Sequence, residues 1–157
     1  MLGELCAEIR NYFTEPEDIH LGIFSIVDGA LASYGSIEPD TQIDFLSEGQ
    51  FFRIVGSVFN DGVYQYPATE LHDEVFRGAV WPMRVPADII ALVQEIQNWK
   101  EKYMSVDSEA MSPYTSESFG GYSYTKSGAS SEGQSGGISW VSAFNDRLNR
   151  YRKARVQ

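Results

Sequence analysis

The sequence is poor in the residues that most often carry catalysis, metal binding or cross-linking. It has one cysteine, Cys6, and two histidines, His20 and His72, which lie in separate segments. A single cysteine cannot form an intrachain disulfide, and these three residues are too few and too scattered for a structural zinc site or a nucleophile activated by a histidine. Neither a phosphate-binding loop nor a dinucleotide-binding fingerprint follows any expected strand. We therefore expect a protein without enzymatic activity, cofactor or metal.

Basic residues are scarce over most of the chain. Twelve Lys and Arg face 22 Asp and Glu, which gives a net charge of −10. This balance argues against a general nucleic-acid binder, because such proteins gain affinity by neutralising phosphates. Five of the twelve basic residues fall within residues 147–157, which contain no acid. This basic ending is typical either of a solvated helix end or of a segment that docks on an acidic partner.

The remaining composition is that of an ordinary globular domain. The 157 residues suffice for one domain, and 43% of them are hydrophobic. No apolar run approaches the ~20 residues of a membrane span, so we expect a soluble, intracellular protein. The pattern of apolar and turn residues predicts an α+β fold with a core over 1–126, a flexible Gly/Ser linker over 127–137 and a basic amphipathic helix or tail over 138–157.

A β-rich module is expected over about 20–83, where short apolar stretches separated by turn residues predict a small antiparallel sheet. The stretches are 21–27, 43–46, 51–59, 63–66 and 79–83. Asn60-Asp61-Gly62 predicts a tight hairpin turn between Val58-Phe59 and Val63-Tyr64, because these residue types tolerate positive φ angles. Most of 31–44 is expected to be an exposed loop.

Helices are predicted on both sides of this module. A short helix is expected from Glu4 to Phe13. A central helix is expected over about 86–104, because its apolar residues recur at three- and four-residue steps after Pro86. An extended clip is expected over about 117–125, and Ser139 is a candidate N-cap for the last helix. The apolar face of that last helix consists of Trp140, Phe144, Leu148 and Tyr151. The two amphipathic helices must bury these faces against each other or the sheet.

Two stretches resemble a known family. Glu117-Ser118-Phe119-Gly120-Gly121-Tyr122-Ser123-Tyr124-Thr125, followed by the Gly/Ser stretch and the ending Arg147-Leu148-Asn149-Arg150-Tyr151-Arg152, resembles the C-terminal signature of tailed-phage head–tail adaptor (head-completion) proteins. The segment 49–64 is similar to a hairpin in small β modules of phage structural proteins. Typical adaptors have early helices where this sequence has the β-rich module. A role as a stopper protein, or in another layer of the connector, is therefore an alternative.

The resemblance implies a structural virion protein of the phage neck, located in the host cytoplasm during assembly. Such proteins form a homo-oligomeric ring, usually twelve-fold, beneath the portal protein, and they receive the next neck or tail-completion protein. They extend the DNA channel, and an acidic lining would let DNA slide without sequence-specific binding. The candidate contacts to the portal or a neighbouring subunit are Tyr122, Tyr124, Trp140, Phe144, Arg147, Leu148, Arg150, Tyr151, Arg152, Lys153 and Arg155.

An alternative from another class also fits the residues. The β-rich half could form the pocket of a small ligand-binding or regulatory module, with Trp81, Tyr64 and Tyr66 at its rim. Oligomeric state separates the two hypotheses, because a ring favours the connector and a monomer that binds a small molecule favours the pocket.

Overall fold

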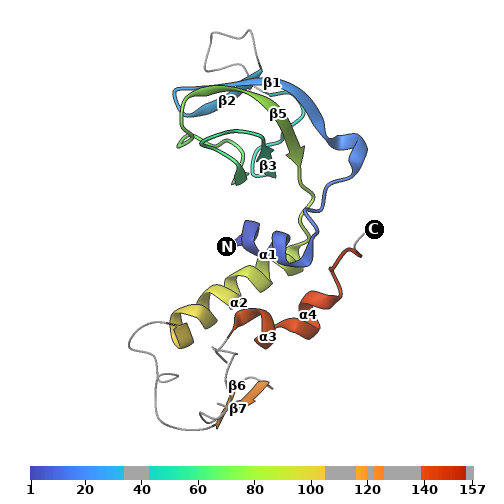
Figure 1. Ribbon diagram of the computed structural model, residues 1–157, viewed down its shortest axis with the longest axis vertical. Helices are drawn as coiled ribbons and strands as arrows, with labels where there is room; N and C mark the ends of the chain where they lie inside the picture. The colour runs from blue at the N-terminus through green and yellow to red at the C-terminus, as the bar shows by residue number, and fades with distance from the viewer. Residues whose placement is uncertain (34–42, 105–115, 120–121, 126–138, 155–157) are drawn as a thin grey trace, which may run out of the picture.

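The computed structural model describes residues 1–33, 43–104, 116–119, 122–125 and 139–154, and these residues have the expected α+β fold. Figure 1 shows a curled sheet at one end of the molecule and a group of helices at the other. The chain starts in the helical part, passes through the sheet and then returns to the helical part.

The larger sheet is antiparallel, and its strand order is β2-β1-β5-β3-β4. The strands are β1 (His20–Val27), β2 (Ala30–Ser33), β3 (Phe51–Val55), β4 (Gly62–Gln65) and β5 (Glu74–Pro82). Side chains alternate between the two faces of each strand, and the concave face closes on a core of large apolar residues. This core includes Phe24, Ile26, Phe52, Ile54, Phe76 and Val80.

The backbones of β3 and β5 approach each other closely where β3 ends. A Cβ atom on Gly78 would lie 2.1 Å from the carbonyl oxygen of Val55, so only glycine allows this approach of the two backbones. Its cross-strand partner in β1 is also a glycine, Gly22. The paired glycines remove two side chains from the concave face, and the sheet can bend there.

The predicted tight turn at Asn60-Asp61-Gly62 is wrong. β3 and β4 do form an antiparallel hairpin, but β3 ends at Val55 and residues 56–61 form a longer connection. Val58 and Phe59 lie in this connection and not in a strand. The positive φ angle, 90°, belongs to Gly56 at the start of the connection, and Gly62 begins β4 without one.

Two further parts of the β module differ from the sequence pattern. β2 overlaps the start of the segment 31–44, most of which was expected to be an exposed loop, and its Leu31 and Ala32 are buried because β2 pairs with β1 through Asp28-Gly29. Residues 34–42 lie outside the described residues. The stretch 43–46 is not a strand, although its Ile43 and Leu46 are buried in the β core.

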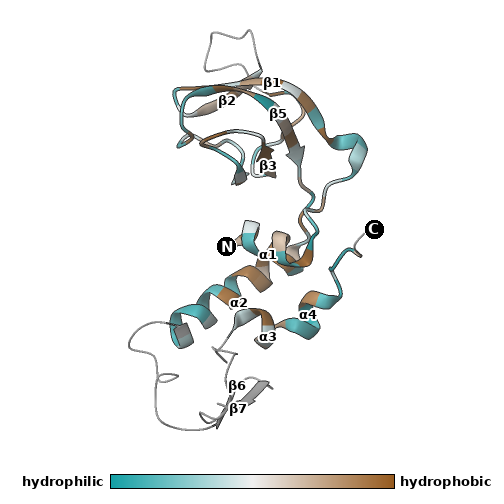
Figure 2. Ribbon diagram, viewed as in Figure 1, coloured by the Kyte–Doolittle hydropathy of each residue, from teal (hydrophilic) through white to brown (hydrophobic). Residues whose placement is uncertain are grey.

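The helical part contains α1 (Leu2–Ile9), α2 (Ala87–Met104), α3 (Trp140–Ala143) and α4 (Asn145–Asn149). The expected central helix is confirmed as α2. Its apolar stripe forms one cluster with residues of α1 and of the C-terminal segment, and Figure 2 shows apolar residues on α1 and the part of α2 beside it. The buried members are Leu5, Ile9, Ile89, Leu92, Ile96, Trp99, Tyr103, Phe144 and Leu148. Burial of a large apolar side chain contributes about 1.5–3 kcal/mol, which explains how such short helices persist.

The predicted C-terminal helix is divided into two. Ser139 caps α3 as expected, because its Oγ accepts a hydrogen bond from the backbone nitrogen of Val141 at 3.3 Å. At Phe144 the backbone leaves helical geometry, with φ −110° and ψ 10°, and α4 starts at the next residue. The break does not disturb the apolar face, since Trp140, Phe144, Leu148 and Tyr151 all contact the helical cluster.

The two connections between sheet and helices run side by side. The short 3-10 helix η1 (Pro16–Asp18) lies in the first connection. Thr14 Oγ donates a hydrogen bond to the carbonyl oxygen of Pro82 at 2.8 Å, and the backbone nitrogen of Arg84 donates to Phe13 at 2.8 Å. The β module is therefore an insertion between α1 and α2.

A cation-π stack supports this junction. The guanidinium of Arg53 lies 3.9 Å from the ring centre of Tyr12 and 4.9 Å from that of Trp81. Arg53 and Trp81 are cross-strand partners on β3 and β5, whereas Tyr12 follows α1. The stack thus attaches the face of the sheet opposite the β core to the helical part.

Two short strands, β6 (Ser116–Phe119) and β7 (Tyr122–Thr125), pair antiparallel as a separate sheet. They correspond to the clip expected over 117–125. The Gly/Ser linker expected over 127–137 lies outside the described residues.

Candidate partner-binding surfaces

The C-terminal segment, the main predicted docking element, packs on the chain's own helices. Phe144 and Leu148 are buried in the helical cluster, so neither side chain is available to a partner in this conformation. This corrects their assignment as partner contacts. Trp140 and Tyr151 are partly buried against the same cluster. An amphipathic pattern looks the same whether its apolar face meets its own chain or another, and here it meets its own.

The basic residues of this segment also have partners within the chain. Arg147 forms two hydrogen bonds to the Glu95 carboxylate of α2, one of them 3.0 Å long. These bonds lower the pKa of Glu95. Arg152 forms an ion pair with Glu8 of α1 at 2.8 Å. Acidic residues of α1 and α2 therefore already pair with two arginines of this basic segment.

Backbone hydrogen bonds fix the segment as well. Asn11 Nδ2 donates to the carbonyl oxygen of Tyr151 at 3.0 Å, and the backbone nitrogen of Lys153 donates to Ile9 at 3.1 Å. The side chains of Arg150 and Lys153 are exposed and remain candidates for a partner surface. Tyr122 and Tyr124 lie on β7, of which only the backbone is described, and Arg155 lies outside the described residues.

A second surface is the β3–β4 connection, where Val58 and Phe59 are 81% and 66% exposed. We call these two residues the tip. The sequence pattern missed the tip because it placed both residues inside a strand. They instead lie at the edge of the module, and the ring of Phe59 is 6.1 Å from that of His72.

A polar network holds the tip in place. Asn60 is 1% exposed, and its Nδ2 donates to the carbonyl oxygen of His72 at 2.9 Å and to Glu74 Oε1 at 2.8 Å. Its Oδ1 accepts from the backbone nitrogen of His72 at 2.8 Å. Ser57 Oγ donates to the Glu74 carboxylate and accepts from the backbone nitrogen of Asn60 at 2.6 Å. The connection is therefore anchored to β5 on both sides of the tip.

The charge of Glu74 belongs to this anchoring. Desolvation would raise the pKa of Glu74, but hydrogen bonds from the side chains of Ser57 and Asn60 and from the backbone of Val58 outweigh it and lower that pKa. Glu74 is thus held as a carboxylate, which is the form that accepts all of these bonds.

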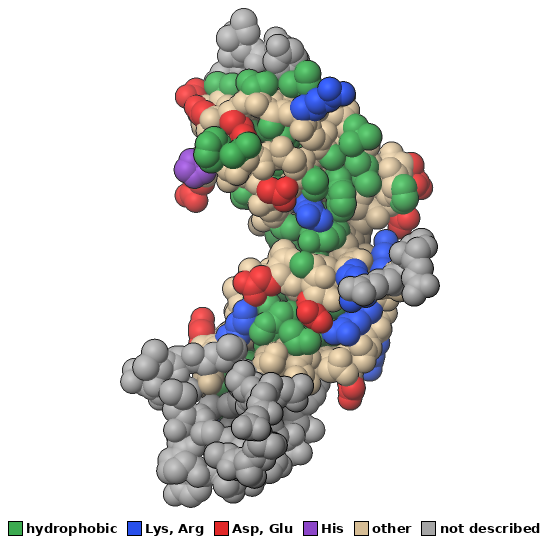
Figure 3. Space-filling model, in the orientation of Figure 1, with side chains coloured by type: hydrophobic (Ala, Val, Ile, Leu, Met, Phe, Trp, Pro, Cys, Tyr) green, Lys and Arg blue, Asp and Glu red, His purple; other side chains and the backbone are tan. Residues whose placement is uncertain are grey.

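A third surface lies on the convex face of the sheet, opposite the β core. Leu21, Ile23 and Val75 are 81%, 45% and 62% exposed there, on neighbouring strands β1 and β5. Arg77 is the cross-strand partner of Ile23 and shares this face. We call these four residues the outer face. Figure 3 shows hydrophobic side chains gathered over the sheet end of the molecule.

The three residues expected to rim a pocket do not meet. Tyr64 and Tyr66 pack against Phe52 on the concave face, with ring centres 5.9 and 6.4 Å away. Trp81 is on the opposite face, where its ring contacts Tyr12 edge-on at 5.8 Å. These side chains therefore do not line one common pocket.

Other kinds of site receive no geometric support from the described residues. Among them, no three His, Cys, Asp or Glu side chains are grouped so that they could share a metal ion. Burial raises the pKa of the Cys6 thiol to about 12, so this cysteine is not an activated nucleophile. Within the same part of the chain, no helix has the length and apolar character needed to cross a membrane. No protein-family model, curated protein or solved structure matches the sequence or the fold.

Proposed function

We propose that the protein is a structural component of the neck of a tailed phage. In this role it forms a ring beneath the portal, joins the head to the tail and extends the DNA channel. The proposal starts from the resemblance of 117–125 and 147–152 to the C-terminal signature of head–tail adaptors. The role requires exposed surfaces that can bind the portal and neighbouring subunits. Arg150 with Lys153, the tip and the outer face are candidates for these surfaces.

The observation that carries the proposal is the helical unit. Helix α1, helix α2 and the C-terminal segment share one core, although the β module separates α1 from α2 in sequence. Adaptors resembled by this chain have a helical core before the signature. In this proposal, α1 and α2 correspond to the early helices of an adaptor, and the β module is inserted between them.

The charge distribution also supports this role. The net charge is −10, and a ring of such subunits would repel the phosphates of DNA that passes through it. Part of the basic C-terminal charge is neutralised internally by Glu95 and Glu8. The exposed Arg150 and Lys153 are left on the surface, where they would meet acidic groups of the portal.

The direct test mixes the full chain with the portal protein encoded by the same phage genome. We expect electron microscopy to show a ring-shaped layer added to the portal, and we expect phages that lack the gene to produce heads that lose DNA or have no tails. A chain that leaves the portal unchanged, together with normal tailed particles in its absence, would overturn the proposal.

The contribution of the basic surface is tested by Arg150→Glu combined with Lys153→Glu. Both side chains are exposed, so the double variant should fold normally while portal binding weakens and loses its salt dependence. The matched control is Arg150→Gln with Lys153→Gln, which removes the charges without reversing them and should give an intermediate loss. Equal binding by all three chains would show that these charges are not used.

A further inference from the structure

The tip and the outer face are two separate apolar surfaces on one subunit. Scattered exposed apolar side chains are ordinary on proteins, but these occur in groups. Val58 and Phe59 are adjacent in the chain, while Leu21 and Val75 flank the cross-strand pair of Ile23 and Arg77. All five apolar side chains are at least 45% exposed, so the tip does not cover the outer face of its own chain.

The tip is held rigidly, which is the second observation. A connection without a function can leave its polar groups in water, but this one buries Asn60 and uses the Glu74 carboxylate to fix residues on both sides of the tip. Fixing two apolar side chains in solvent costs free energy in the isolated chain. That cost is offset if a partner receives them, because less conformational entropy is then lost on binding.

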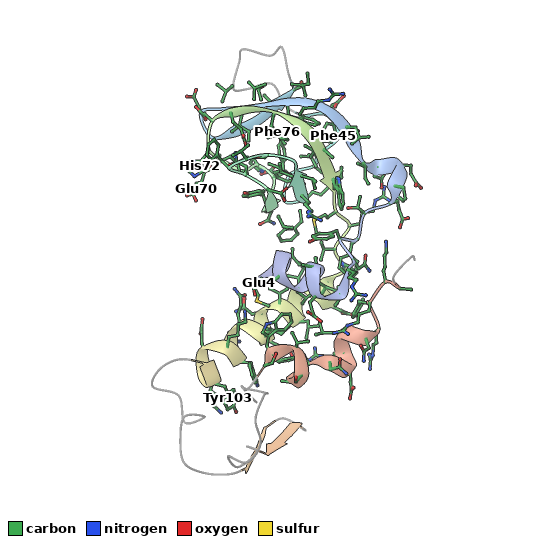
Figure 4. All side chains as sticks on the ribbon, viewed as in Figure 1. Glu4, Phe45, Glu70, His72, Phe76 and Tyr103 are labelled. Atoms are coloured by element: carbon green, nitrogen blue, oxygen red, sulfur yellow. The ribbon has the colours of Figure 1, made fainter. Side chains whose placement is uncertain are left out.

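The charges around the two surfaces have opposite signs. Asp61, Glu70 and Asp73 are exposed in the segments that flank the tip, and Figure 4 shows Glu70 beside His72 at the edge of the module. The outer face carries Arg77, which is exposed and is not among the ion pairs of the described residues. An acid-flanked tip therefore fits an apolar face with an arginine at its centre.

We infer that the tip of one subunit docks on the outer face of a second copy of this chain. The contact uses different residues on its two sides, so it is head-to-tail, and repetition of such a contact gives a ring when the rotation closes. The inference rests on the proposed function, because it names the contact between subunits in the neck ring.

The contact is small, and its size determines the conditions under which we expect to detect it. A stable interface has about 20–30 residues on each side, far more than the tip supplies. The contact should therefore be weak between free subunits and should strengthen on the portal, where neighbours are held at high effective concentration.

Disulfide cross-linking between two variants tests the contact directly. One chain carries Val58→Cys and the other carries Leu21→Cys, both at positions that are 81% exposed. These changes keep Phe59, Ile23 and Val75, and the native Cys6 is fully buried and so does not compete. With mild oxidant and portal present, we expect the mixed pair to cross-link several-fold more than either chain alone.

The control replaces the Leu21→Cys chain with a Gln97→Cys chain, whose cysteine is on the exposed side of α2. Cross-linking to Gln97→Cys at the same yield would overturn the inference, and so would a predominance of Val58→Cys homodimers. If wild-type rings form on the portal but the mixed pair does not cross-link in them, the inference fails while the proposed function stands. If the pair cross-links but wild-type chain never binds the portal, the proposed function fails and the contact stands.

A charge exchange provides a second, independent measurement. Glu70 is the acid to change, because Asp61 and Asp73 accept internal hydrogen bonds from Gly56 and Gly29. Arg77→Glu and Glu70→Arg should each lower the cross-linking yield about two- to fivefold. The chain with both changes should recover most of the yield, a rescue that purely structural damage would not show. If the chain with both changes does not recover the yield, Glu70 does not face Arg77 in the contact, and this pairing is wrong.

Discussion

At the scale of single residues, Asn60 determines the shape of the β3–β4 connection. His72 lies outside the strands, and the Asn60 side chain takes the place of a strand partner for its backbone. The Nδ2 of Asn60 donates to the carbonyl oxygen of His72, and the Oδ1 accepts from its backbone nitrogen. It also donates to the Glu74 carboxylate. A buried amide with all of these bonds stabilises one conformation of the connection, and the same amide without them would be costly.

Asn60→Ala should lower the free energy of unfolding by about 2 kcal/mol, because the partners at His72 and Glu74 are left without their hydrogen bonds. Urea unfolding followed by circular dichroism measures this change. The control is Asn98→Ala on α2, where an exposed side chain accepts one hydrogen bond from Gln94, and its effect should be under about 0.5 kcal/mol. Equal effects would mean that the network contributes nothing.

At the scale of elements, the C-terminal segment depends on tertiary contacts. Helix α4 has five residues, and a helix of this length is unstable in isolation. Leu148 is fully buried between the segment and the other helices. Asn11, which follows α1, and Glu95 of α2 both form hydrogen bonds to the segment. Removal of the segment would therefore uncover the helical core.

Leu148→Ala should destabilise the protein by about 3 kcal/mol, because it removes a buried leucine and leaves a cavity next to α1 and α2. Thermal unfolding is the measurement. Asn149→Ala, at the exposed neighbouring position, is the control and should shift the free energy by less than about 0.5 kcal/mol. A melting temperature that Leu148→Ala leaves unchanged would show that the segment is detached in solution.

The sequence patterns succeeded where burial follows a local period. The three- and four-residue spacing predicted α2 and also the apolar face that runs through Phe144 and Leu148. The expectation that the two amphipathic helices bury their faces against each other is confirmed, but the spacing could not show that α1 completes the same core. That information is in the contacts with Leu5 and Ile9, which are far away in sequence.

The patterns failed where distant groups decide the conformation. Asn60-Asp61-Gly62 has the composition of a tight turn, but Asn60 bonds to residues 12 and 14 positions later and is drawn into a longer connection. β2 was missed because Ala30-Leu31-Ala32-Ser33 has little β propensity, and its pairing with β1 outweighs that weakness. The sequence pattern missed the exposed tip for the same reason, because the bonds of Asn60 to His72 and Glu74 hold Val58 and Phe59 outside a strand.

At the scale of the whole molecule, three glutamates connect its parts. A side-chain hydrogen bond from Lys100 of α2 lowers the pKa of Glu4 in α1. The pKa of Glu95 is lowered by Arg147 of the C-terminal segment, and that of Glu74 by the tip network. Each carboxylate is therefore most useful to the fold in its charged form.

Acid should remove this stabilisation. A carboxyl whose folded pKa lies below its ordinary value of 4.5 stabilises the fold above pH 4.5 and loses that contribution as the pH falls through the folded pKa. The variant chain carries Glu4→Gln, Glu74→Gln and Glu95→Gln. We expect the gap in unfolding free energy between wild type and this variant to be constant near neutral pH and to shrink below pH 4.5.

The control for this titration removes the same amount of charge from exposed positions. It carries Glu17→Gln, Glu48→Gln and Glu70→Gln. This comparison separates the three bonded carboxylates from the general relief of repulsion that a net charge of −10 brings as acids are protonated. A gap that shrinks equally in both variants would assign the effect to net charge alone.

The side-by-side connections allow the β module to be removed or exchanged as a unit. The segments before and after the module are already hydrogen-bonded to each other, through Thr14 with Pro82 and Phe13 with Arg84. A short turn across that point would therefore close the helical unit without moving α1 or α2. The module can in this way be exchanged, enlarged or deleted while the helical unit stays constant, so the tip and the outer face belong to the part of the chain that can change most without unfolding the rest.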